Sequence, residues 1–158
     1  MRRGNGIKVL AIGLMLALIF ITTILVQSIS PVTKAKKQAK AVANSIAGVE
    51  RVDDFYWFIR EKTYFTIIGR DGNNESKIVL IPEDGSEAVV MNASEGLSEK
   101  EAIVKVLETK EVKRVKKINL GMVKGEPVWE VTAVGNSDPL SYYLVDFKSG
   151  DIIETIHY

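Results

Sequence analysis

The chain has 158 residues and a nearly balanced charge, with 21 Lys and Arg side chains against 20 Asp and Glu. One histidine and no cysteine exclude a lipid-modified cysteine and make a zinc site of the usual ligand types a poor interpretation. Residues 31–158 carry 18 basic and 20 acidic side chains, a balance of −2, which gives no support for nucleic-acid binding.

An unbroken uncharged run extends from Val9 to Val26, directly after a short basic start. As an α-helix its 18 residues would span roughly 27 Å at ~1.5 Å per residue, close to the ~30 Å hydrocarbon core of a bilayer. The sequence therefore predicts a basic tail over residues 1–8 and a membrane-spanning anchor over residues 9–27. A cleavable signal peptide is the alternative, but its apolar stretch is usually ~7–15 residues long.

The basic residues on the two sides of this run argue in opposite directions about orientation. Those of the tail favour a cytoplasmic N-terminus by the positive-inside rule. Four lysines on the other flank oppose it, and they lie farther from the run: Lys34, Lys36, Lys37 and Lys40. We therefore expect a single-pass protein of the cell membrane, with its C-terminal domain outside the cytoplasm.

Residues 33–92 have the pattern of one helix followed by strands. Small and apolar residues recur at three- and four-residue steps from Ala35 to Ile46, and Gly48 follows. Asp71 to Glu75 has the composition of a calcium-binding loop without the EF-hand spacing, so a structural turn is the better interpretation. The predicted strands lie at Val49–Arg60, Tyr64–Arg70, Ile78–Ile81 and Ala88–Met91.

Residues 98–158 have the same order of elements. Ser98 and Glu101 form a capping box at the start of a helix whose apolar face is Ala102, Ile103, Val106 and Leu107. Alternation of Ile118, Leu120 and Met122 indicates a half-buried strand. Further strands are predicted at Val128–Val134, Tyr142–Phe147 and Ile152–Ile156.

The two halves align without a gap at an offset of 65 residues, which places Phe55 on Leu120 and Gly85 on Gly150. We interpret the chain as an α+β protein with two tandem units, residues 33–92 and 98–158. Each unit is a helix packed on a small antiparallel sheet. Chance similarity of two helix–sheet units is the alternative.

No pattern of catalytic residues emerges. The only histidine, His157, is the penultimate residue, a poor place for a general base because chain ends fray. The carboxylates lie mostly in turns, where they cap local backbone groups. We therefore predict a protein without enzymatic activity that uses no cofactor, metal or small-molecule substrate.

Four consecutive aromatic residues, Phe55 to Phe58, cannot all face one core from a strand. Either the other copy or the linker covers the second face, or that face is an aromatic patch for a partner protein. The second interpretation makes four side chains candidate partner contacts: Tyr56 and Phe58, with Tyr142 and Tyr143 at the equivalent stretch of the second unit.

Several stretches together resemble the TseB-like (YpmB) family of Gram-positive bacteria. They are the basic tail, the anchor, the lysine-rich helix, Ser98–Ala102, Trp129–Thr132 and Tyr142–Gly150. The C-terminal unit also resembles a PepSY domain. The resemblance implies two tandem cystatin-like modules outside the cytoplasmic membrane that regulate cell-wall elongation through a class B penicillin-binding protein.

The resemblance supplies no binding motif to carry over, because the matching residues maintain the fold. A membrane-anchored interaction module that acts on a penicillin-binding protein is therefore the first functional hypothesis. The PepSY-like half alone suggests the alternative, an inhibitor or regulator of an envelope protease.

Overall fold

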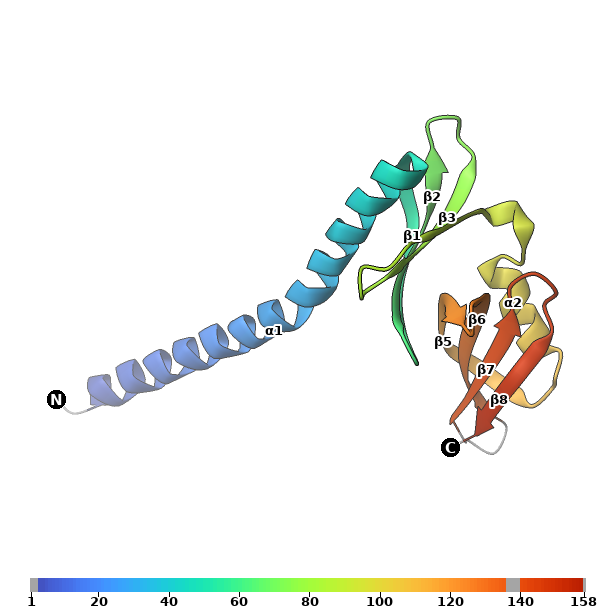
Figure 1. Cartoon of the computed structure of the whole chain (residues 1–158). Coiled ribbons are helices and arrows are strands. Elements are labelled where there is room, and N and C mark those ends of the chain that lie inside the picture. The colour runs from blue at the N-terminus through green and yellow to red at the C-terminus, as the bar shows by residue number, and fades with distance from the viewer. Residues whose placement is uncertain (1–2, 136–139, 158) are drawn as a thin grey trace. The chain divides into compact units, whose positions relative to one another are not determined.

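The computed structural model describes residues 3–135 and 140–157, with side chains described from residue 12 onward except for residues 24–30. The chain divides into two compact units, residues 1–37 and 38–158. Each is treated by itself below. Figure 1 shows the elements of both.

A single helix, α1 (Arg3–Ala47), provides the first unit and extends into the second. Within it the hydroxyls of Thr22 and Thr23 donate to backbone carbonyls three and four residues earlier, so these polar groups are satisfied inside the helix. The predicted tail, 1–8, and both ends of the predicted anchor, 9–27, lie outside the described side chains. Among the residues that are described, no helix has the length and apolar character needed to cross a membrane.

The second unit begins with the end of α1 and a sheet of four antiparallel strands in the order β1-β2-β3-β4 (Figure 1). The strands are β1 (Val49–Ile59), β2 (Thr63–Asp71), β3 (Ser76–Pro82) and β4 (Val89–Asn92). Gly48, with φ +66°, ends the helix as predicted. Ala39 and Ala43 pack on this first sheet, whereas Val42 and Ile46 of the expected apolar face are exposed.

A short 3-10 turn, η1 (Ala93–Glu95), leads to α2 (Glu99–Leu107) and a second antiparallel sheet, in the order β5-β6-β7-β8. Its strands are β5 (Val112–Val123), β6 (Glu126–Gly135), β7 (Leu140–Asp146) and β8 (Ile152–His157). The predicted capping box is present at Ser98 and Glu101. Ala102 and Val106 are buried, but Leu107 is 42% exposed because α2 ends there.

The helix-then-sheet order is thus present twice, but the ungapped offset of 65 residues is wrong. Both first strands have two register irregularities, between Val49 and Arg51 and between Val52 and Asp54 in β1, and between Val112 and Arg114 and between Val115 and Lys117 in β5. Matching these places Phe55 on Ile118, an offset of 63 rather than on Leu120. The boundaries of the two predicted domains, 33–92 and 98–158, stay a prediction.

These irregularities are β-bulges, which place two residues of one strand opposite one of its neighbour. The inward position then recurs every third residue instead of every second. In β5 the inward residues are Val112, Val115 and Ile118, all partly buried against the core, and the four residues between them are exposed. The same burial pattern recurs at the start of β1.

The two sheets pack against each other within the second unit. Phe58 of β1 is fully buried with Val128 and Leu144 of the second sheet. A side chain at Gly121 of β5 would collide with the ring of Phe58, so only glycine fits there. The hydroxyl of Thr66 donates to the carbonyl of Leu120 at 2.7 Å.

An ion pair supplements this apolar contact. Arg60, after β1, donates through Nε to Glu130 Oε2 at 2.7 Å and lies 3.7 Å from Glu154. Asn119 reaches the other oxygen of Glu130 at 3.5 Å. The charge of Glu130, whose side chain is 10% exposed, is therefore compensated at the junction between the sheets.

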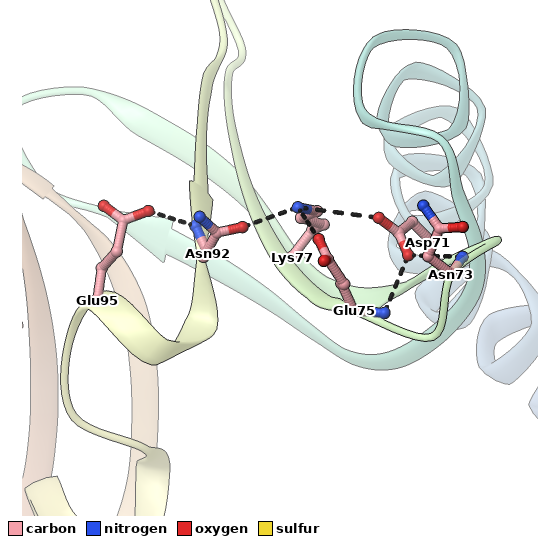
Figure 2. A network of polar contacts seen from close by, with 6 residues as sticks. All are labelled: Asp71, Asn73, Glu75, Lys77, Asn92 and Glu95. Atoms are coloured by element: carbon pink, nitrogen blue, oxygen red, sulfur yellow. Dashed lines mark hydrogen bonds and ion pairs between the residues drawn. The ribbon is translucent and has the colours of Figure 1, made fainter.

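The Asp71 to Glu75 segment is a structural turn, as interpreted from its composition. Asp71 Oδ1 accepts hydrogen bonds from the backbone N–H groups of Asn73 and Glu75, both at 2.9 Å. Lys77 lies beside the turn and bonds Glu75 and Asn92 at 2.8 Å, as Figure 2 shows. The lysine ammonium thus holds the position that a bound cation would need.

Candidate functional site

The aromatic residues of β1 are divided between two covered faces. Phe55 stacks on Phe65 and packs with the end of α1, whereas Tyr56 and Phe58 point toward the second sheet. The expectation that Tyr56 and Phe58 face outward is therefore wrong, because each is less than 10% exposed. Covering of the second face by the other copy is the arrangement found.

The two tyrosines of β7 differ from each other. Tyr143 is 2% exposed and belongs to the core around Trp129. Tyr142 is half-buried, on the opposite face of the strand. Three of the four predicted contact residues are thus inside the fold, and the contact role of Tyr142 stays a prediction.

The burial of Tyr56 creates a recess that sequence reasoning missed. It has a volume of about 370 Å³, at the lower end of the range for ligand pockets. Its walls come from the first sheet, the connecting segment, the start of α2 and β6. The lining residues are Asp54, Tyr56, Ile68, Ser76, Ile78, Ala93, Leu97, Ser98, Glu99, Lys100 and Trp129.

Hydrogen bonds fix the walls of this recess. The Tyr56 hydroxyl donates to Glu99 Oε2 at 2.5 Å, and Trp129 Nε1 donates to the carbonyl of Leu97 at 2.9 Å. The Tyr56 and Trp129 rings meet edge to face with centroids 5.4 Å apart. Burial, followed by the neighbouring Glu99 carboxylate, raises the pKa of Tyr56. Tyr56 is therefore a neutral hydrogen-bond donor at physiological pH.

The recess offers binding rather than chemistry. Its wall includes apolar side chains, two carboxylates from Asp54 and Glu99, and the ammonium of Lys100. Among the residues described, no cluster of three His, Cys, Asp or Glu side chains has the geometry to hold a metal ion. A mixed wall of this kind suits one side chain of a protein partner.

His157 is held more firmly than its position near the chain end suggested. It lies in β8 opposite Ser141, whose hydroxyl is 2.8 Å from His157 Nδ1, and its ring packs edge to face on Tyr143. Ser141 is 2% exposed. The contact joins two paired strands and offers an incoming substrate no accessible nucleophile.

Two helix-on-sheet units with a shared recess define an interaction module, and comparisons with known proteins agree with that class. Residues 38–82 match the model for the cell wall elongation regulator TseB-like domain. Residues 96–156 match the model for the peptidase propeptide and YPEB domain, PepSY. The predicted resemblance to the TseB-like family, with a PepSY-like C-terminal half, is confirmed.

Among solved structures, the YpmB protein from Bacillus subtilis is similar, with a TM-score of 0.70 and 26% sequence identity. The similarity covers 77% of this chain and 96% of the YpmB chain. No curated protein matches. Both domain families are regulatory or inhibitory, are not known as enzymes and are typically extracellular. The chain is accordingly a regulatory interaction module of extracytoplasmic type.

Proposed function

We propose that this protein regulates cell-wall elongation by binding a membrane-anchored class B penicillin-binding protein outside the cytoplasm. The observation that carries the proposal is the TseB-like match over residues 38–82, which include the end of α1 and the first three strands. The proposal also includes the anchor over residues 9–27, with the N-terminus in the cytoplasm. An anchor raises the effective concentration of the module near other membrane proteins.

The recess beside Tyr56 and Trp129 is the contact point in this proposal. Its walls come from both sheets and from α2, so a side chain that enters it contacts both halves of the second unit. Hydrogen bonds to Glu99 and Leu97 hold the walls in place before a partner arrives. A preorganised recess of this kind reduces the entropy lost on binding.

The experiment is capture from crosslinked cells of the full-length protein, with an anchor-only chain as background. Ser76→Phe fills the recess from its wall, and Ser86→Phe adds the same ring at an exposed turn as the matched control. We expect the native chain and Ser86→Phe to enrich a penicillin-binding protein, and Ser76→Phe to lose it. Equal enrichment by both variants would contradict the role of the recess.

The PepSY match over residues 96–156 favours a second candidate, regulation of an envelope protease. The same capture separates the two proposals. Enrichment of a membrane protease without a penicillin-binding protein, together with inhibition of that protease by the purified chain, would support the second and reject the first.

A further inference from the structure

Four basic residues of β5 form an exposed row that neither proposed function uses. Lys113, Arg114, Lys116 and Lys117 occupy the outward positions created by the two bulges, and all four are exposed. We call them the basic strip. No ion pair joins any of the four to a carboxylate among the residues that the structure describes.

The surroundings do not neutralise this charge. The stretch of β6 paired with the strip, Val131–Gly135, contains no charged residue. Glu108, on the approach to β5, lies 3.8 Å from Lys105. Glu111 offsets Lys110, so residues 110–117 keep a balance of +4 within a chain of net charge +1.

The fold does not require this charge. The corresponding outward positions of β1 are Glu50, Arg51, Asp53 and Asp54, with the same bulges and the same exposure. There Asp53 is paired with Arg51 at 2.9 Å and with Arg70 at 3.3 Å. Bulges and charges on an edge strand protect it from pairing with other chains. Because the mixed set on β1 gives the same protection, protection alone does not explain four cations on β5.

The chemistry of the strip selects a multiply charged ligand. Its apolar residues Val112, Val115 and Ile118 pack on the core, so no apolar side chain stands among the cations. Insertion into a lipid interface needs such side chains, and so does the centre of a protein interface. The strip spans roughly 13 Å at ~3.3 Å per residue. Neither described recess is lined by any of its residues, which leaves no enclosure for a small anion.

We propose that the basic strip binds a linear phosphodiester polyanion of the cell envelope, laid along β5. Lysine suits phosphate as a point charge, and affinity comes from the release of counterions along the polymer. This goes beyond the proposed function, because it needs no protein partner and uses a surface outside the recess. It adds an attachment of the module to an anionic polymer of the envelope.

The test measures binding of the full chain, in an uncharged detergent, to synthetic poly(glycerol phosphate) over a range of salt concentrations. One variant replaces Lys113, Arg114, Lys116 and Lys117 with glutamine. The matched control replaces Lys34, Lys36, Lys37 and Lys40 with glutamine and removes the same charge from exposed positions of α1. Thermal unfolding of both variants checks that the fold is retained.

We expect the native chain and the control variant to bind, with affinity that falls steeply as salt increases. Loss of the strip should weaken binding at least tenfold and reduce the slope of log K against log salt by about 3, since each phosphate contact contributes ~0.7. Equal loss in both variants would contradict the proposal. So would tighter binding to poly-glutamate, or to phosphatidylglycerol vesicles, than to poly(glycerol phosphate).

Discussion

The first halves of β1 and β5 have the same backbone irregularities and opposite charge. Both have two bulges and an inward residue at every third position, yet β1 exposes three acids and one arginine where β5 exposes four cations. Arg51 and Arg114 correspond, so the strands differ in charge at only three outward positions. The comparison teaches that the bulges fix which residues face the core, while the charge of the outward residues is free to serve another purpose.

The largest expected effect concerns the contact that joins the two sheets. Phe58→Ala should lower the free energy of unfolding by about 3–5 kcal/mol, because it leaves a cavity at a fully buried aromatic site. Ile59→Ala, at a neighbouring residue that is 64% exposed, is the control and should change it by less than about 0.5 kcal/mol. Urea unfolding measures both. A loss below about 1 kcal/mol for Phe58→Ala would mean that the sheets are not coupled there.

The next effect tests the three-residue period itself. Val52→Ser in β1 and Val115→Ser in β5 should each cost about 1–2 kcal/mol, because both valines pack partly buried on a core. The outward changes Glu50→Ser and Lys116→Ser should stay within about 0.5 kcal/mol of the native chain. Urea unfolding of the four variants gives the comparison. Outward substitutions that cost as much as the inward ones would refute the shared bulged geometry.

The two helices differ in how they begin, and this gives a smaller effect. The helix that covers the first sheet continues from α1, whereas α2 begins at Ser98, whose side chain accepts a hydrogen bond from the backbone of Glu101. Ser98→Ala should cost about 1 kcal/mol, and Ser98→Thr should recover most of it. Ser94→Ala is the exposed control. Thermal unfolding that does not distinguish Ser98→Ala from Ser94→Ala would show that the cap is not needed.

The smallest effect compares the turns after β3 and β7. Hydrogen bonds from the Ser86 hydroxyl and backbone, then Lys62, lower the pKa of Asp84 to about 2. In the second sheet, bonds from Ser149 lower the pKa of Asp146. A lowered carboxyl pKa stabilises the fold above the unfolded value of 3.8, and for Asp84 this contribution is lost as pH falls through about 2.

An NMR titration measures both carboxyl groups in one experiment. Ser86→Ala should raise the pKa of Asp84 toward 3.8 and leave Asp146 unchanged. Titration of Asp84 near 3.8 in the native chain would contradict the turn geometry.

Local signals in the sequence were enough for much of the fold. Gly48 and the Ser98 capping box marked helix ends correctly, because each acts through its own backbone. The first half of β5 was missed, since two bulges replace strand alternation with a three-residue period in Val112–Ile118. The same bulges made the ungapped alignment of the two halves fail.

The candidate site was less accessible to sequence reasoning. Its walls combine residues from five elements, and the direction in which Tyr56 points depends on the packing of the second sheet on β1. A glycine at position 121, where the ring of Phe58 needs space, was the one local sign of this packing. The basic strip was hidden by the near-zero net charge, because composition does not show where charges gather.

The central comparison is tested most directly by exchanging the three charged positions in which the strands differ. Lys113→Glu, Lys116→Asp and Lys117→Asp alone should abolish binding of the full chain to poly(glycerol phosphate). Adding Glu50→Lys, Asp53→Lys and Asp54→Lys restores the net charge and builds the strip on β1, so binding should return. Binding that survives the first exchange, or does not return after the second in a folded chain, would contradict the account.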